Sequence, residues 1–289
     1  MISGVYKQFY NGVKQIIPSE RLLHDELSLL AFGTDASFYR MLPKLVIKAK
    51  DEKEISAILS AASEFDVPVT FRAAGTSLSG QSISDSVLVL VSHGWDKHQI
   101  LDNGKKIRLQ VGIRGIRANI YLAPYGRKIG PDPASTDSAM IGGIISNNAS
   151  GMSCGTHENS YRTIADARII LADGTILDTA DKNSVAKFRE THKEMIQKLE
   201  EISARINSKP ELKERIAKKH SIKNTTGYGL NSFVDYSDGI DIIKHIIVGA
   251  EGTLAFLSDV TLNTVVDLPD KALALIVYPT IKIACEAVQ

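Results

Sequence analysis

The sequence predicts an α+β protein, and three observations support this fold class. In the first part of the chain, short apolar runs alternate with an amphipathic helix, which is the pattern of an α/β unit. Further strand-like runs follow, interrupted by long helices rich in charge. Glycine is crowded into one region: twelve of the 21 glycines fall between Arg72 and Gly155, and none falls between Thr175 and Thr226. Function is therefore expected in the loops of the glycine-rich region, where bare backbone can approach a ligand.

The chain is expected to open with two helices, at residues 5–17 and 20–32, because a Pro-Ser pair separates two stretches of helical spacing. The next helix follows Asp51, an N-cap residue that forms a capping-box-like pair with Glu54. Three apolar runs are expected strands: residues 45–47, 67–71 and 87–91. The order of these elements is that of an α/β unit with one glycine-rich loop at residues 72–82.

The second part is expected to contain a hairpin and several helices. An Ala-Asp-Gly turn that ends at Gly174 joins the two hairpin strands. The expected strands are residues 107–111, 167–171, 175–178, a run ending near Val266, and 272–278. The expected helices are residues 113–125, one long amphipathic helix from Val185 to Ile206, 211–220, and 280–288. Residues 242–248 fit either a strand or the end of a helix.

Composition and charge exclude several classes of protein. Lys and Arg number 34 against 33 Asp and Glu, so the net charge of +1 gives no electrostatic basis for binding nucleic acid. The 44% hydrophobic content argues against disorder. Two cysteines, Cys154 and Cys285, form no disulfide framework and suit a reducing compartment. No apolar run approaches the roughly 18–20 residues of a membrane span, and the N-terminus lacks a signal-peptide core, so a cytoplasmic protein is expected.

The first candidate site is the loop Arg72-Ala-Ala-Gly-Thr-Ser-Leu-Ser-Gly-Gln-Ser82, which lies between two apolar strands. Its successive amides can form an anion-binding concavity, and the hydroxyls of Thr76, Ser77 and Ser79 add donors. It is neither a Walker loop, which needs Gly-Lys-Ser/Thr, nor the G-x-G-x-x-G dinucleotide fingerprint. The loop is therefore a candidate pyrophosphate cradle, and a tight surface turn of small residues is the alternative.

The second candidate combines a loop, GPDPAS at residues 130–135, with an apolar stretch, MIGGIISNNASG at residues 140–151. Two adjacent glycines in a helix cost about 1 kcal/mol each against Ala, which is explained if a flat ligand packs on the bare backbone. Packing of Gly142 and Gly143 against a neighbouring strand is the alternative. The two asparagines that follow favour a ligand, because buried amides need partners.

A third segment, GAEGTL at residues 249–254, is a weak signal by itself. The order and spacing of all three segments together, however, resemble the FAD-binding domain shared by vanillyl-alcohol-oxidase-type (PCMH-type) flavoproteins. The resemblance extends from about residue 42 to residue 266 and looks closest to FAD-linked D-lactate and D-2-hydroxyacid dehydrogenases. The stretches NNASGMSCGTHENSYRT and IKNTTGYGLNSFVDY are especially similar to members that carry a C-terminal iron–sulfur region.

The resemblance implies a two-lobed fold, with a small α/β lobe and a larger mixed-sheet lobe, and it implies positions that bind FAD. Arg72 and the loop after it would hold the pyrophosphate, through Ala74, Gly75, Thr76, Ser77, Leu78, Gly80 and Gln81. The flavin and its ribityl chain would be lined by Pro131, Asp132, Pro133, Ser135, Ile141, Gly142 and Gly143, with Asn148 and Gly151 on the same wall. The adenine and diphosphate side would be formed by Ile164, Glu251, Gly252 and Thr253.

Departures from the family pattern bear on the cofactor. Some relatives attach FAD covalently through a histidine in the first loop, but here that position is Thr76, so non-covalent FAD is expected. Cys154 lies in a cofactor-facing segment and is expected to be a small buried hydrophobe. No H-x-H or H-x-x-x-H pair and no Cys-x-x-Cys motif occurs, so neither a zinc site nor an iron–sulfur cluster is expected in this sequence.

The resemblance also divides the chain. Residues 1–40 are expected to form an N-terminal helical segment, 41–267 the FAD-binding domain, and 268–289 the start of a truncated substrate (cap) domain. In the family the catalytic base and any metal site come from the cap domain. An iron–sulfur cluster, where a member has one, is carried by a region further toward the C-terminus. Catalytic residues are therefore unknown here, and the chain alone is expected to bind FAD but to turn over poorly.

Three functions remain open. The first is oxidation of a D-2-hydroxy acid, foremost D-lactate, to the 2-oxo acid by hydride transfer to flavin N5. Electrons would then pass to a quinone, cytochrome or flavoprotein, and the enzyme would be cytoplasmic or peripheral to the inner membrane. The second is an FAD-dependent enolpyruvyl reductase of cell-wall synthesis, which would use NADPH. The third is a protein that has the fold but binds no flavin.

Overall fold

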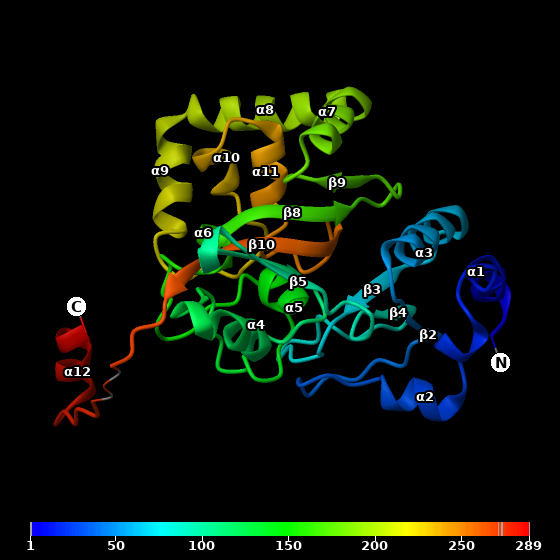
Figure 1. Cartoon of the computed structure of the whole chain (residues 1–289), viewed down its shortest axis with the longest axis horizontal. Coiled ribbons are helices and arrows are strands. Elements are labelled where there is room, and N and C mark those ends of the chain that lie inside the picture. The colour runs from blue at the N-terminus through cyan, green and yellow to red at the C-terminus, as the bar shows by residue number, and fades with distance from the viewer. Residues whose placement is uncertain (1, 271, 273, 289) are drawn as a thin grey trace.

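Two separate sheets organise the chain into two lobes (Figure 1). The structure is a computed structural model that describes residues 2–270, 272 and 274–288. The predicted α+β class is confirmed, because helices cover both sheets and the larger sheet is antiparallel. Among the described residues, no helix is both long enough and apolar enough to cross a membrane.

The small lobe is built on a four-stranded sheet with the order β1-β2-β4-β3. β1 pairs antiparallel with β2, whereas β2, β4 and β3 are parallel. The strands are β1 (Leu22–Leu23), β2 (Leu45–Lys48), β3 (Val69–Arg72) and β4 (Val87–Leu90). The helices are α1 (Gly4–Val13), α2 (Glu26–Ala31) and α3 (Glu52–Phe65), with a 3-10 turn at Ser19–Arg21.

Side chains of the small sheet alternate between two apolar cores, as the pleat of a strand requires. Ile47 and Val89 belong to the main core, together with buried residues of α1 and α3. Val46 and Leu88 point to the other face and pack near the end of α2. Both faces of these strands are therefore buried, which is why their sequences are continuously apolar.

The N-terminus of α3 confirms only half of the expected capping box. The Asp51 side chain accepts a hydrogen bond from the amide of Glu54 at 3.0 Å. The Glu54 carboxylate does not return to Asp51; it accepts from the amide of Lys50 at 2.8 Å and from Arg21 Nη1 at 2.7 Å. Glu54 thus links α3 to the 3-10 turn at Ser19–Arg21.

The large lobe is built on a six-stranded sheet with the order β5-β6-β10-β8-β9, in which β7 also pairs with β10. These pairings are antiparallel, and the 11-residue β10 is the strand on which β6, β7 and β8 meet. The strands are β5 (His98–Leu101), β6 (Lys106–Gln110), β7 (Arg127–Ile129), β8 (Ile164–Ile170), β9 (Ile176–Asp178) and β10 (Phe256–Val266).

Helices cover both sides of the large sheet (Figure 1). α4 (Gly115–Leu122) and α5 (Ile141–Ser146) lie on one side. The other side carries α7 (Lys182–Thr191), α8 (Lys193–Asn207), α9 (Pro210–Lys219), α10 (Ser232–Asp235) and α11 (Gly239–Ile246). Shorter turns are α6 (Ser160–Thr163) and the 3-10 segments Asp102–Gly104 and Ala123–Tyr125, and α12 (Ile281–Val288) stands apart from both lobes.

Some elements differ from those that the sequence predicts. The expected helix from Val185 to Ile206 is two helices, because His192 leaves helical geometry with φ −120° and ψ 31° and stacks on Phe188. The expected second helix at residues 20–32 is a 3-10 turn, a short strand and α2. The ambiguous segment that starts at residue 242 lies in α11.

The expected strand at residues 272–278 is wrong for the residues that are described. Residues 272 and 274–278 have no strand, because no partner strand pairs with them, and residue 273 lies outside the described residues. The expected cap segment, 268–289, likewise includes residues 271, 273 and 289, which are not described. The following helix, expected at 280–288, is present as α12.

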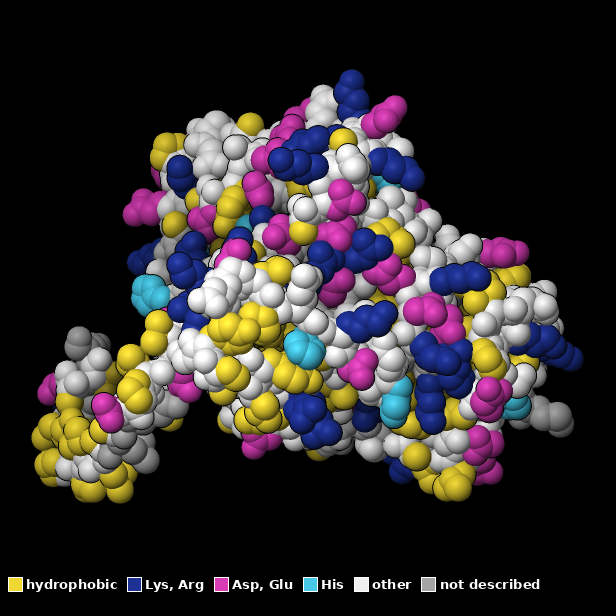
Figure 2. Space-filling model, in the orientation of Figure 1, with side chains coloured by type: hydrophobic (Ala, Val, Ile, Leu, Met, Phe, Trp, Pro, Cys, Tyr) yellow, Lys and Arg dark blue, Asp and Glu magenta, His cyan; other side chains and the backbone are white. Residues whose placement is uncertain are grey.

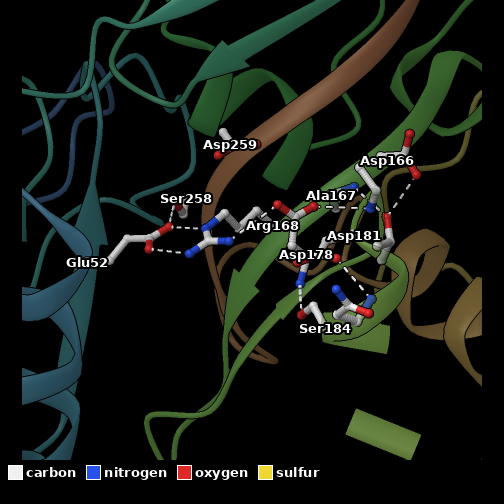
Figure 3. A network of polar contacts seen from close by, with 12 residues as sticks. Glu52, Asp166, Ala167, Arg168, Asp178, Asp181, Ser184, Ser258 and Asp259 are labelled. Carbon is white, nitrogen blue, oxygen red and sulfur yellow. Dashed lines mark hydrogen bonds and ion pairs between the residues drawn. The ribbon is translucent and has the colours of Figure 1, made fainter. Parts of the chain in front are cut away.

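A polar network joins the two lobes (Figure 3). Glu52, the first residue of α3, forms two parallel bonds with Arg168 of β8, at 2.6 Å to Nε and 2.8 Å to Nη2. Ser258 of β10 donates a further bond to the same carboxylate. Arg168 also lies 3.3 Å from Asp178, which Arg108 approaches at 2.7 Å. A single carboxylate of the small lobe is thus fixed to two strands of the large sheet.

This environment changes the acidity of Glu52. Burial alone would raise the pKa of Glu52, but hydrogen bonds from Arg168 and Ser258 outweigh that effect and hold the pKa below its ordinary value of 4.5. Because the folded-state pKa is lowered, the bridge stabilises the protein above that ordinary value. Its contribution is lost as the pH falls through the pKa of the folded state.

Replacing Glu52 with Gln is expected to lower the free energy of unfolding at neutral pH by about 1–3 kcal/mol, because Arg168 loses its charged partner in a partly buried position. Urea unfolding at several pH values measures the effect. Glu64→Gln, an exposed position on the same helix, is the matched control and should change little. Equal stability of Glu52→Gln and wild type at neutral pH would contradict the bridge.

Candidate functional site

A cavity of about 370 Å³ lies between the two lobes, within the range typical of small-molecule sites. We call it the interlobe cavity. The small lobe contributes the end of β3 and the loop after it, residues 73–82. The large lobe contributes α5, the segment after α5, and the start of β10. The cavity therefore depends on how the two lobes are held together.

The loop after β3 has unpaired amides at residues that line the cavity. Thr76 and Leu78 both line it, and within the described residues their backbone amides donate to no other group. Ser77 shapes the loop from inside, because its Oγ accepts from the amide of Ser79 at 3.2 Å and from that of Gln81 at 3.3 Å. Free amides on a curved loop of small residues are suited to bind an anion such as a phosphate.

The two adjacent glycines of α5 have different surroundings. A Cβ atom added at Gly142 would lie 3.0 Å from the Cβ of Val111, so this glycine permits close packing of α5 on the end of β6. A Cβ atom added at Gly143 would meet nothing within 4 Å, although Gly143 lines the cavity. Gly142 therefore fits the packing explanation, whereas a ligand against Gly143 stays a prediction.

The turn at residues 249–254 docks on the C-terminal end of α5. The amide of Glu251 donates to the carbonyl of Ser146 at 2.9 Å, and Asn147 Nδ2 donates to Glu251 Oε1 at 2.7 Å. Burial raises the pKa of Glu251, and the bond from Asn147 opposes this shift. Glu251 has φ +52°, a left-handed conformation that the turn imposes on a non-glycine residue.

The structure brings together most of the residues that the sequence predicted as cofactor-binding. Twelve of them line the interlobe cavity: Ala74, Gly75, Thr76, Ser77, Leu78, Gln81, Pro133, Ser135, Gly142, Gly143, Glu251 and Gly252. They come from all three segments that the sequence singled out. The other nine do not line it: Arg72, Gly80, Pro131, Asp132, Ile141, Asn148, Gly151, Ile164 and Thr253.

Several of these nine residues support the cavity wall from behind. Arg72 Nη1 donates to the carbonyl of Thr34 at 2.7 Å and so fixes the start of the loop. The Asp132 carboxylate accepts from the amides of Ser153 and Cys154, at 3.0 and 3.2 Å. A Cβ atom added at Gly151 would lie 1.8 Å from the carbonyl oxygen of Asp132, so only glycine fits there.

The remaining positions lie in the core or in neighbouring turns. Ile141 and Ile164 are buried in the main apolar core. Thr253 Oγ1 donates to the carbonyl of Ala250 at 2.7 Å. Asn148 lines a second, smaller cavity next to the interlobe cavity. A contact of these four side chains with a cofactor remains a prediction.

Part of the cavity wall has no signal in the sequence. Apolar residues in or next to strands also line the cavity, among them Val91, Val111 and Phe256. Their apolar character indicated burial but not which buried positions face a cavity. Lys223 also lines the cavity, and a lysine in a polar loop gives no sequence signal that separates it from a solvated side chain.

No metal site accompanies the cavity. Within residues 2–270, 272 and 274–288, no cluster of three or more His, Cys, Asp or Glu side chains could hold a metal ion. Cys154 is buried, and its Sγ accepts a hydrogen bond from the amide of Gly151 at 3.2 Å. The cavity wall combines apolar side chains with backbone groups, hydroxyls, amides and two charged side chains.

Comparison with known proteins finds a matching family model and similar solved structures. Residues 43–180 match the family whose model is described as FAD binding domain. The fold is similar to that of an alkyldihydroxyacetonephosphate synthase, with a TM-score of 0.60 and 17% identity, over 90% of this chain and 40% of that one. This likeness and the two sheets confirm the two-lobed α+β fold.

Several curated enzymes are similar to this chain in sequence. A D-2-hydroxyglutarate dehydrogenase of Haemophilus influenzae is 28% identical over 81% of this chain and 24% of its own length. Glycolate oxidase subunit GlcD of Escherichia coli is 29% identical over 57% of this chain and 34% of its own. A D-lactate dehydrogenase of Archaeoglobus fulgidus is 23% identical over 84% and 44%. The resemblance to FAD-linked D-2-hydroxyacid dehydrogenases is confirmed, and the chain spans less than half the length of these relatives.

The two glycines of α5 should respond oppositely to Ala. Gly143→Ala is expected to leave the free energy of unfolding unchanged or to raise it by up to about 1 kcal/mol, because the methyl group meets open space and Ala favours the helix. Gly142→Ala is expected to lower it by about 1–3 kcal/mol through crowding against Val111. Chemical denaturation without added cofactor measures both variants. Equal effects at the two positions would refute the assignment.

Proposed function

We propose that this chain is the FAD-binding portion of a flavin-dependent dehydrogenase that oxidises a D-2-hydroxy acid, foremost D-lactate, to the 2-oxo acid. The observation that carries the proposal is the interlobe cavity, which gathers residues of three distant glycine-rich segments around one space. The FAD-binding family match and the names of the relatives support the cofactor and the substrate class.

The residues present fit FAD. The unused amides of Thr76 and Leu78 suit the diphosphate, and the open face of Gly143 leaves room for a flat ring system beside α5. When bound, FAD supplies the acceptor for hydride, whereas the protein binds and orients it and limits access of water. Thr76 lacks the imidazole through which some relatives attach FAD, and the thiol of Cys154 is buried outside the cavity wall. We therefore infer that the FAD is non-covalent.

The substrate and the acceptor are proposed on the basis of the relatives alone. The relatives' names cover D-2-hydroxyglutarate, D-lactate and glycolate, which share a hydroxyl group next to a carboxylate. We infer an electron acceptor of the quinone, cytochrome or flavoprotein class. An iron–sulfur cluster in such an enzyme would need thiolate ligands beyond the two cysteines of this sequence. The proposed FAD-binding domain is residues 41–267, with 1–40 before it and a substrate domain from 268.

FAD binding is tested most simply by titrating the cofactor into the folded protein and following flavin fluorescence. The wild type should bind, and Gly143→Leu should weaken binding at least about tenfold, because the side chain enters the cavity. Ala186→Leu adds the same bulk on the exposed side of α7 and should bind as the wild type does. A folded wild type that binds no FAD would rule out the proposal.

The substrate class is tested with the protein as its gene encodes it, loaded with FAD and kept anaerobic. D-Lactate, D-2-hydroxyglutarate or glycolate should bleach the flavin absorbance, and L-lactate should bleach it far more slowly. The rate among the three acids identifies the preferred substrate. Bleaching by NADPH, with none by any of these acids, would instead indicate an enolpyruvyl reductase.

A further inference from the structure

The second, smaller cavity lies between α6 and the loop at residues 222–229, and the function proposed so far gives it no role. We call it the polar cavity. Its volume of about 30 Å³ is room for about two water molecules, or for one small ion in their place. Its wall comes from three parts of the chain: residues 148–162, residues 220–231 and residues 248–249. A particle bound here would therefore connect three separate segments.

Three asparagine side chains of this wall have their oxygen atoms engaged by backbone amides. Oδ1 of Asn148, Asn159 and Asn224 accepts such a bond at 3.2, 3.0 and 3.0 Å, in that order. Because a backbone amide can only donate, the atom that meets it must be the oxygen, and each side chain keeps its Nδ2 as a donor. Among the described residues, none of these three nitrogens has a hydrogen-bond partner. The asparagines therefore offer donors rather than acceptors to a ligand.

The donor of Asn224 is the one that most needs a partner. Its Nδ2 is buried, and nothing in the part of the chain that the structure describes accepts a bond from it. A buried donor that stays unpaired is costly, so such an atom on the wall of a polar cavity calls for a bound acceptor. The acceptor can be an anion or a water molecule, and the charge around the cavity decides between the two.

The charge around the polar cavity is positive. Arg162 lines the cavity, and no lining residue that the structure describes is acidic. Nη1 of Arg162 lies 3.5 Å from Oδ2 of Asp235, which occupies only part of the donor set of the guanidinium. The segment that supplies the loop adds further charge, because residues 215–234 contain four Lys or Arg and no Asp or Glu. Donors and cations together attract an anion and repel a cation.

We propose that the polar cavity binds a small inorganic anion, namely chloride, which is close to a water molecule in size. The three asparagine nitrogens donate to the anion, and the guanidinium of Arg162 supplies the opposite charge. The bound anion holds the 222–229 loop to α6 and so stabilises the folded large lobe. The interlobe cavity takes no part in this site, so the inference does not depend on the binding of FAD.

The test follows thermal unfolding with excess FAD while chloride replaces gluconate, which is too large for the cavity, at constant ionic strength. Asn224→Asp keeps the oxygen that accepts from the backbone but exchanges the donor for a negative charge. Chloride should raise the unfolding midpoint of the wild type by about 2–4 °C more than that of Asn224→Asp. Arg162→Gln should also lose this response, whereas Arg215→Gln, an exposed position of α9 off the cavity, should keep it. Equal responses of the wild type and Asn224→Asp would overturn the proposal and leave the cavity to water.

The position of the anion is tested in crystals grown with bromide, which takes the place of chloride and scatters anomalously. An anomalous peak is expected beside Nδ2 of Asn224 in the wild type and is expected to be absent in Asn224→Asp. Ordered water in the cavity, or bromide that binds only elsewhere, would overturn the site. Neither outcome bears on the proposed function, which the titration with FAD tests separately.

Discussion

The bridge between Glu52 and Arg168 is the interaction on which the arrangement of the molecule depends. It joins the first turn of α3 to β8 through two bonds of 2.6 and 2.8 Å, with Ser258 as a third partner. Aromatic packing of Phe71 on Phe256, at 4.8 Å between ring centroids, supports the same junction on the apolar side. The interlobe cavity lies between parts that these contacts hold, so its shape depends in part on Glu52 and Arg168, which do not line it. The surface around this junction mixes acidic and basic side chains (Figure 2).

The sequence predicts local features of this fold well. The buried strands β2 and β4, the cap at Asp51 and the loop after β3 all follow from residue types within a few positions of one another. Features that depend on contacts between residues far apart in the sequence cannot be predicted from local residue types. The break between α7 and α8 falls at His192, whose Nε2 lies 3.1 Å from Oδ2 of Asp173, 19 residues earlier in the chain. The strand expected at 272–278 fails for the same reason, since pairing decides it.

In the candidate site, too, some features can be predicted from the sequence and others depend on contacts between residues far apart in it. The resemblance placed twelve residues on one cavity wall, yet Arg72 and Asp132 act behind the wall, through bonds to backbone groups that are far apart in sequence. The two adjacent glycines of α5 have different surroundings. Gly142 permits packing on Val111, whereas Gly143 leaves open space. The sequence allows both explanations for a glycine pair, but it does not show which glycine has which surroundings. That depends on the residues that lie opposite each glycine in the fold.

The central claim is that the interlobe cavity is where the chain holds FAD. Amide hydrogen exchange with and without saturating FAD tests it directly, because the free amides of the 73–82 loop are accessible until a ligand covers them. If FAD binds in this cavity, amide exchange should slow in the 73–82 loop, in α5 and in the turn at 249–254. Exchange in α8 should stay unchanged. Flavin binding that leaves all three segments as accessible as before would contradict it.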